Sequence, residues 1–168
     1  SDSVDDELKS AAKSAVQLVD KYINEYRLSD AVEAVIGLAK RSNKYIDETA
    51  PWTLAKDEAQ KERLGTVLYN LLESIRYLSV LLTPFMPDTA KAIQNQLNCD
   101  ITDYNSLSQF GAIKAGNKVG TPSVLFSRID AEKMMEEIAK EREAAIKEAE
   151  KENEKPEFVA FLDQIGMD

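Results

Sequence analysis

Large apolar residues recur every three or four positions between residues 57 and 82, a spacing that an α-helix places on one face. The repeat comprises Leu64, Val67, Leu68, Leu71, Leu72, Ile75, Leu78 and Leu82. Because this is the most apolar helical stretch of the chain, we expect it to lie at the centre of a bundle. It should stop at residues 83–87, where two prolines interrupt the pattern.

Two amphipathic helices are predicted ahead of this stretch, and a short one after it. The first covers about residues 4–26, with Ser3 as its N-cap. The second starts after Ser29 or Asp30 and ends by Ala50, because Pro51 disfavours helical geometry in the residue before it. Residues 51–56 are expected to form a turn or loop, and residues 88–97 a short helix.

The C-terminal part differs in composition. Residues 98–128 hold three of the six glycines, so we expect an irregular segment with a short strand over 123–126. Residues 131–155 are mostly Glu, Lys, Arg and Ala, which is typical of a solvated helix, and an amphipathic piece follows Pro156. The predicted fold is an all-α, up-and-down helical bundle of about four or five helices over residues 1–130, followed by a charged helical linker over residues 131–168.

Composition excludes several kinds of site. The chain has no histidine and one cysteine, Cys99, so it can form neither an internal disulfide nor the usual Cys/His zinc site, and it lacks the commonest general base. We see no bilayer-spanning apolar run and no signal peptide, so we expect no membrane partner and a cytoplasmic location. The net charge of −9 argues mildly against nucleic acid, although residues 40–45 are locally basic.

Three motifs follow one another along the chain. They are residues 43–52 (NKYIDETAPW), 81–87 (LLTPFMP) and 116–129 (GNKVGTPSVLFSRI). In this order they resemble the anticodon-binding domain of methionyl-tRNA synthetases, which carries N-x-Y-I-x-x-x-x-P-W, a proline stop after a long helix, and a Gly-rich turn before Leu-Phe-Pro-Arg-Ile. Ser127 stands where that family usually has proline. The resemblance covers roughly residues 10–135.

The resemblance implies tRNA anticodon recognition as part of a methionine–tRNA ligase, a class I enzyme that uses ATP and magnesium. The class I motifs of the His-Ile-Gly-His and Lys-Met-Ser-Lys-Ser types are absent, so this chain alone is expected to be noncatalytic and to hold no cofactor. The family's base-reading Asn-x-x-x-Arg pair has no match here either, and its helix is expected to precede Ser1.

The implied partners are the anticodon loop of methionine tRNA and the protein's own catalytic domain, toward which residues 110–130 are expected to pack. A homodimer of the full-length protein is a further candidate. The charged helix after residue 130 resembles a linker to a C-terminal tRNA-binding domain.

The candidate recognition residues gather around Pro51. The resemblance assigns Trp52 to stacking on an anticodon base, whereas the residue type alone also suits a plug at the end of the bundle. Asn43 could read a base edge or fix the turn with a hydrogen bond. Tyr45 could pack in the bundle or touch RNA.

Basic residues on the same helix are candidates for phosphate contacts, or else ordinary solvated charges. They are Lys40, Arg41 and Lys44, with Lys56 and Lys61 as weaker candidates. The acidic run at residues 5–7 is expected to be a solvated face, and Asp47 and Glu48 point about 100° apart on a helix, so they do not form a catalytic pair.

Two alternatives stay open at this point. A helical protein–protein adaptor would fit the acidic balance, and would give Trp52 no role in RNA binding. The same domain from a valine, leucine or isoleucine enzyme is disfavoured by residues 118–129. A stand-alone enzyme fits least, because no convergent set of titratable residues emerges.

Overall fold

The chain divides into two compact units, Ser1–Leu125 and Phe126–Asp168. The computed structural model describes residues 2–153. Its α-helices are α1 (Ser3–Asn24), α2 (Leu28–Thr49), α3 (Pro51–Leu54), α4 (Lys61–Leu82), α5 (Pro87–Leu97) and α6 (Ala131–Asn153), and its 3-10 helices are η1 (Glu58–Gln60) and η2 (Tyr104–Ser108). The amphipathic piece predicted after Pro156 lies outside the described residues.

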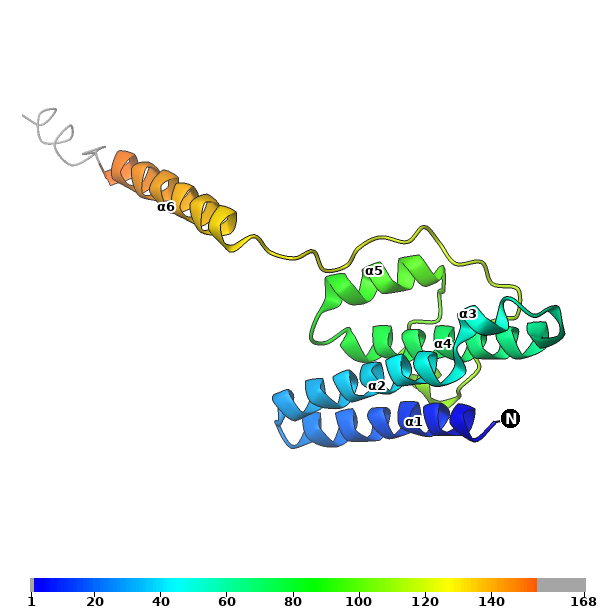
Figure 1. The fold of residues 1–168 in the computed structure, drawn as a ribbon. Coiled ribbons are helices and arrows are strands. Elements are labelled where there is room, and N and C mark those ends of the chain that lie inside the picture. Colours follow the sequence, from blue (N-terminus) through cyan, green and yellow to red (C-terminus); the bar gives the residue numbers. More distant parts are fainter. Residues whose placement is uncertain (1, 154–168) are drawn as a thin grey trace, which may run out of the picture. The chain divides into compact units, whose positions relative to one another are not determined.

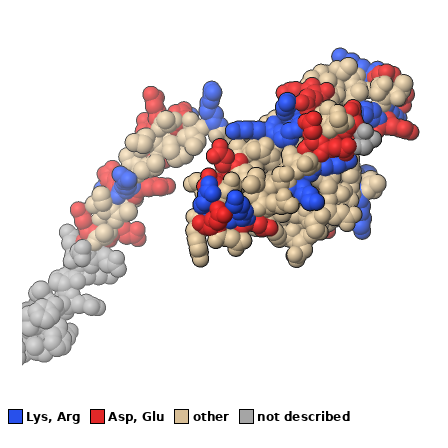
Figure 2. All heavy atoms as spheres, turned by 90° about the horizontal axis from the view of Figure 1, so that it is seen from below, with Lys and Arg blue, Asp and Glu red and all other residues tan. Residues whose placement is uncertain are grey.

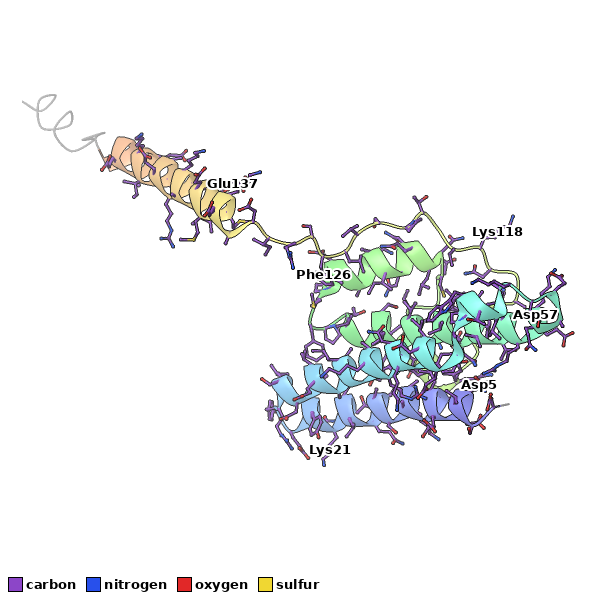
Figure 3. All side chains as sticks on the ribbon, viewed as in Figure 1. Asp5, Lys21, Asp57, Lys118, Phe126 and Glu137 are labelled. Atoms are coloured by element: carbon purple, nitrogen blue, oxygen red, sulfur yellow. The ribbon has the colours of Figure 1, made fainter. Side chains whose placement is uncertain are left out.

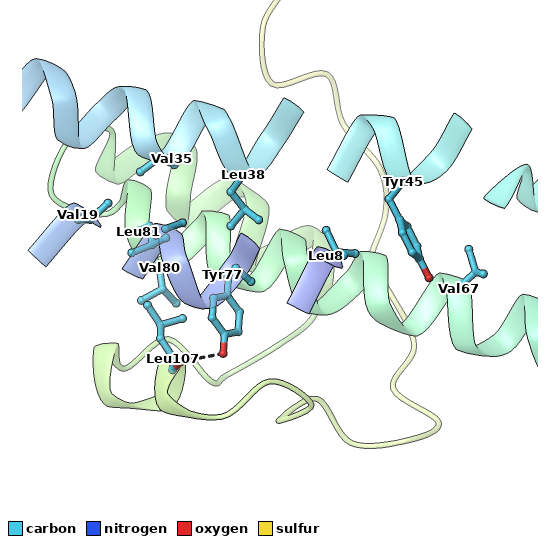
Figure 4. Packing of buried hydrophobic residues seen from close by; sticks show 12 residues of the cluster. Leu8, Val19, Val35, Leu38, Tyr45, Val67, Tyr77, Val80, Leu81 and Leu107 are labelled. Atoms are coloured by element: carbon cyan, nitrogen blue, oxygen red, sulfur yellow. Dashed lines mark hydrogen bonds between the residues drawn. The ribbon is translucent and has the colours of Figure 1, made fainter. Parts of the chain in front are cut away.

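The first unit is a helical bundle built around α4. Helices α1 and α2 run antiparallel, joined by a tight turn at Tyr26, and α4 contacts α1, α2, α3 and α5 (Figure 1). The predicted central position of this helix is therefore confirmed. Buried apolar side chains from α1, α2, α4 and η2 form one cluster (Figure 4): Leu8, Ala12, Ala15, Val19, Val35, Leu38, Tyr45, Val67, Tyr77, Val80, Leu81 and Leu107.

The all-α prediction is confirmed for residues 2–153, where no strand is found. The strand predicted over 123–126 is wrong: these residues are exposed and form no ladder with any described segment, and a strand needs a partner for its backbone groups. None of the described helices is long and apolar enough to cross a membrane.

Several helix ends differ from the predicted ones by a few residues. Asp2, not Ser3, is the N-cap of α1, and α2 begins at Leu28 after Arg27 rather than after Ser29 or Asp30. The Arg27 guanidinium donates from Nε to Asp30 Oδ2 at 2.8 Å, which occupies a carboxylate that was expected to cap the helix. Side-chain pairing of this kind is not visible in a local capping pattern.

The buried face of α4 is more polar than its leucine repeat suggested. Leu68, one of the predicted core positions, is 46% exposed, whereas Asn70, Glu73 and Arg76 are buried. Helix α4 is covered on several sides, so some of its polar positions also face protein. Each of these buried polar groups has a partner, as buried polar groups generally require.

The segment after α5 is irregular, as predicted, and is fixed to α4 by hydrogen bonds. The Tyr77 hydroxyl donates to the Leu107 carbonyl at 2.8 Å, and the Tyr69 hydroxyl donates to the Ile113 carbonyl at 2.7 Å. In return, the Ile113 N–H donates to Glu73 Oε1 at 2.6 Å. This segment, whose one element of secondary structure is the short 3-10 helix η2, thus satisfies several of its backbone groups with side chains of α4.

A second part of this segment lies along α5. The Gly120 N–H donates to the Gln96 carbonyl at 2.7 Å, and the Gln96 side chain exchanges hydrogen bonds with the backbone of Ser123. A Cβ at Gly120 would lie 2.8 Å from the Asn95 carbonyl oxygen, which is too close for any side chain. Glycine is required here by the closeness of the two backbones.

Gly120→Ala is therefore expected to push the segment around residue 120 away from α5. Amide hydrogen exchange at residues 120 and 123 should accelerate by about tenfold or more, since one or two hydrogen bonds are lost. Gly37→Ala is the matched control, because a Cβ at Gly37 meets nothing within 4 Å. That control should raise stability by about 0.5–1 kcal/mol, as Ala for Gly does within a helix. Unchanged exchange in Gly120→Ala would contradict the close-approach argument.

The described part of the second unit is a short non-helical stretch, residues 126–130, followed by helix α6. Its side chains are exposed as far as residue 150, and Lys147 Nζ lies 2.8 Å from Glu143 Oε1, one helical turn away. The prediction of a solvated helix is confirmed over residues 131–150.

Candidate nucleic-acid interface

The junction between α2 and α3 holds Trp52 on a rigid turn. Ala50 adopts a left-handed backbone conformation, with φ 43° and ψ 60°, which ends α2 and starts α3. Pro51 then occupies the first turn of α3, where its missing N–H costs nothing. The sequence predicted a turn or loop over residues 51–56; residues 51–54 form a single helical turn, and residues 55 and 56 continue it as a turn.

The indole of Trp52 is 54% exposed. Leu54, two residues further on, packs against the core cluster instead. The structure therefore does not support the alternative in which Trp52 plugs the end of the bundle. A half-exposed aromatic residue leaves part of its surface open to contact by an external ring.

Asn43 and Lys44 lie exposed on α2, on the helix that leads to this turn. The Asn43 side chain makes no hydrogen bond within residues 2–153, so its amide is free to bind an external donor and acceptor. The Lys44 side chain is 69% exposed, and its Nζ lies 3.4 Å from Glu48. Lys40, one turn earlier, is also exposed.

Arg41 is held inside the protein's own ion pairs. Its guanidinium lies 2.9 Å from Glu48 and 3.1 Å from Glu7, and its side chain is only 15% exposed. It also donates to the Val4 carbonyl at 3.4 Å. A guanidinium with these partners joins α1 to α2, and a phosphate would have to displace carboxylates to reach it. The structure thus favours a structural role over the predicted phosphate contact.

Tyr45 is completely buried, with an exposed fraction of 0%. Its hydroxyl donates to Asp5 Oδ1 at 2.6 Å and accepts from Asn70 Nδ2 at 3.1 Å. The ring has no free face for a base, so Tyr45 packs in the bundle and the predicted contact with RNA is wrong for this residue.

Asp5 is the centre of this buried arrangement. Arg63 donates to it from Nη1 at 2.6 Å and from Nη2 at 2.9 Å, a bidentate pair that brings α4 to α1. These hydrogen bonds from Arg63 lower the pKa of Asp5 to about 2, against the opposing effect of burial. Burial raises the pKa of Tyr45 to about 12, so its hydroxyl keeps its proton at neutral pH. We refer to Asp5, Tyr45, Arg63 and Asn70 as the Asp5 cluster.

The prediction that Asp5 lies on a solvated face is wrong. Asp5 is 1% exposed. One pattern could have shown it: position 5 continues the buried repeat of Leu8, Ala12, Ala15 and Val19 by a helical step. Its partners Tyr45 and Arg63 come from two other helices, so no local pattern links them to it.

The surface charges near this end of the bundle are mixed. Lys and Arg side chains lie among Asp and Glu side chains on the face drawn in Figure 2. Lys56 is exposed, and Lys61 is exposed but paired with Glu58 at 2.8 Å. Asp47 is exposed while Glu48 turns toward Arg41, so these two carboxylates do not converge. No group of three or more metal-binding side chains occurs among the described residues.

Solved structures share this fold. The apo form of methionyl-tRNA synthetase from Mycobacterium tuberculosis superposes with a TM-score of 0.70 and 26% identity, covering 77% of this chain and 27% of that chain. The same enzyme in complex with methionyl-adenylate matches with a TM-score of 0.69. The bundle is thus of the class found within an aminoacyl-tRNA synthetase.

The sequence relationships are closer. The family described as "Anticodon binding domain of methionyl tRNA ligase" matches residues 2–147. The methionine–tRNA ligases of Clostridium acetobutylicum and Clostridium perfringens are 45% and 46% identical, each over 89% of this chain. The chain spans 23% of the length of these curated relatives.

The chain belongs to the family of methionyl-tRNA ligase anticodon-binding domains. The resemblance seen in the three sequence motifs is thereby confirmed. None of the relatives named above is a valine, leucine or isoleucine enzyme or an adaptor, so neither alternative gains support.

Proposed function

We propose that this chain recognises the anticodon loop of methionine tRNA at the α2–α3 junction. Trp52 stacks on an unpaired base, and Pro51 holds it in place at the start of α3. Asn43 offers a donor and an acceptor to a base edge, and Lys44 contacts a phosphate. The observation that carries the proposal is the half-exposed Trp52 on a fixed helical turn, at 54% exposure.

Physical chemistry favours this use of the site. Anticodon bases are unpaired in a loop, and single-stranded RNA is recognised mainly by stacking on aromatic side chains and by hydrogen bonds to base edges. The overall charge of −9 means that non-specific attraction to phosphates is weak. Stacking and base contacts at the junction must therefore supply most of the affinity and selectivity.

The complete protein, by the same proposal, attaches methionine to its tRNA at the expense of ATP in the cytoplasm. The catalytic domain with its ATP and magnesium lies outside this chain, so no catalytic step is assigned to the residues described here. The bundle contributes specificity by holding the anticodon loop. In this proposal, residues 1–130 form the recognition domain and residues 131–168 form a charged linker. The full-length protein forms a homodimer.

Trp52→Ala is expected to weaken binding of a stem-loop with a C-A-U anticodon by about 5- to 150-fold, the loss of one base-stacking interaction. The measurement is fluorescence polarisation of a labelled stem-loop, with a second stem-loop of changed anticodon for comparison. The wild-type chain should prefer C-A-U, and this preference should shrink in the variant. The experiment is best repeated in the longest native polypeptide that contains this chain.

Tyr26→Ala is the matched control. Tyr26 is 93% exposed in the turn between α1 and α2, so it is an equally free aromatic ring. Tyr26 precedes α2 and Trp52 follows α2, so the two aromatic residues are separated by the length of this helix, about 33 Å. Binding that falls equally in both variants would indicate non-specific aromatic contact. An affinity that is the same for both anticodons and is unchanged by both substitutions would refute the proposal and leave the adaptor alternative.

A further inference from the structure

The Asp5 cluster joins three helices at the end of the bundle that carries Trp52. Asp5 comes from α1, Tyr45 from α2, and Arg63 and Asn70 from α4. Figure 3 shows Asp5 at the same end of the bundle as α3, while Lys21 lies toward the other end of α1. All four side chains are linked by hydrogen bonds of 2.6–3.1 Å.

Tyr45 is the last buried side chain of α2 before Trp52. It points from α2 toward α4 (Figure 4), where Asn70 donates to its hydroxyl. Its backbone carbonyl accepts from the Thr49 hydroxyl at 2.7 Å, in the last turn before Ala50. The end of α2 is therefore fixed through the ring and through the backbone of one residue.

A second bridge lies beside the first. Arg41 joins Glu48, in the last turn of α2, to Glu7 in the first part of α1. On the far side of Trp52, Leu54 packs against the core and α3 contacts α4. Trp52 thus sits on a short stretch of backbone held at both ends.

We infer that Asp5 and Tyr45 are positioning residues for Trp52, which the polar cluster holds in one orientation for base stacking. The inference rests on the proposed anticodon function for its binding part. An apolar contact would stabilise the end of α2 without fixing its rotation, whereas a hydrogen-bonded phenol has to point at its acceptor. The cluster therefore specifies the direction of the junction in addition to stabilising it.

Trp52 is the only tryptophan of the chain, so intrinsic fluorescence reports on this residue alone. We expect Tyr45→Phe to increase the fast component in the time-resolved anisotropy of Trp52, because the hydroxyl bonds to α1 and α4 are lost. The same variant should bind the C-A-U stem-loop about 3- to 10-fold more weakly, the equivalent of one buried hydrogen bond. Circular dichroism at the same temperature checks that the variant is folded.

Tyr77→Phe is the matched control. It removes a buried phenol hydroxyl that donates to Leu107 at 2.8 Å, on the irregular segment after α5. This substitution causes a comparable loss of stability at a place away from α2. The fast component of the Trp52 anisotropy and the affinity for the stem-loop should therefore both stay within about twofold of wild type. Asp5→Asn is a second test, since it keeps the shape of the side chain but removes the charge that Arg63 pairs with; it should mobilise Trp52 as Tyr45→Phe does.

Unchanged anisotropy in both Tyr45→Phe and Asp5→Asn overturns the inference. It is also overturned if Trp52 becomes mobile in these variants, Trp52→Ala weakens binding, and yet Tyr45→Phe binds like wild type. If Trp52→Ala itself leaves stem-loop binding unchanged, the proposed function fails instead, and the anisotropy alone then decides whether the cluster orders Trp52.

Discussion

Glu73→Ala is expected to lower the free energy of unfolding by about 3–5 kcal/mol, the cost of leaving a buried charge without its partner. Glu73 is 0% and Arg76 1% exposed, and Arg76 Nη2 lies 2.9 Å from Glu73 Oε2. The substitution leaves a guanidinium in the protein interior with no carboxylate. Urea unfolding followed by circular dichroism measures the change.

The same carboxylate also holds the irregular segment. It accepts from the Gly111 N–H at 3.0 Å and from the Ile113 N–H at 2.6 Å. Both donors lose their acceptor in the variant, so their amide hydrogen exchange should accelerate more than that of the α1–α2 pair. The loss of stability and the local opening have one cause, because one side chain serves both the helix and the segment.

A graded series provides the control for this prediction. Glu73→Gln keeps one carbonyl oxygen for the backbone donors and should cost less than Glu73→Ala. Glu62→Ala removes an exposed carboxylate from the same helix and should change stability by no more than about 0.5 kcal/mol. A loss below about 1 kcal/mol in Glu73→Ala would show that the buried pair contributes little.

Arg63→Met is expected to lower the free energy of unfolding by about 2–3 kcal/mol at neutral pH, because Asp5 then stays buried with only the Tyr45 hydroxyl as its side-chain donor. The loss should be smaller than for Glu73→Ala, since the Arg63 side chain is 26% exposed and its pair with Asp5 is partly screened.

The effect of Arg63→Met should depend on pH in a defined direction. The pKa of Asp5 is lowered from 3.8 to about 2 in the folded protein. The unfolded chain therefore takes up this proton first on acidification, and the stabilisation, present above about pH 5, is lost as the pH falls toward 2. The difference in stability between wild type and Arg63→Met should shrink by about 2 kcal/mol over this range.

Lys61→Met is the control for this pH dependence. Lys61 lies in the first turn of α4 and pairs with Glu58 at 2.8 Å, but both side chains are exposed, at 75% and 86%. Such a surface pair contributes at most about 0.5 kcal/mol, so the stability difference between wild type and Lys61→Met should change by no more than that between pH 6 and pH 2. A difference in the free energy of unfolding between wild type and Arg63→Met that stays constant from pH 6 to pH 2 would contradict the role assigned to Asp5.

Hydrophobic periodicity was enough to predict the bundle. The long helix, its central place and its stop near Pro84 follow from the leucine spacing and from proline chemistry, which act within a few residues of sequence. Short-range chemistry was less reliable at helix ends. The start of α2 and the short helix α3 at Pro51 depend on a side-chain pair and a left-handed Ala50 that no capping pattern contains, whereas α1 starts at a local capping box of Asp2 and Asp5.

The candidate site was predicted in part. The motif around Pro51 and Trp52 led to the junction, and Asn43 and Lys44 lie exposed on α2, the helix that leads to it. The same stretch of sequence also suggested Arg41 and Tyr45, which face the protein instead. Neighbouring positions on a helix point in different directions, and only the packing of α1 and α4 against α2 decides which of them reach solvent.

The sequence by itself determined the helices, the bundle and the family motifs, because helical periodicity and proline or glycine signals are local and repeat along the chain. Only the tertiary structure decided that Asp5 pairs with Arg63, that Tyr45 lies between them and Asn70, and that Glu73 holds Ile113. These partners stand 25 to 58 residues apart in the chain. A buried charge is stable only when such distant groups meet, so its position depends on the whole fold and not on its neighbours in sequence.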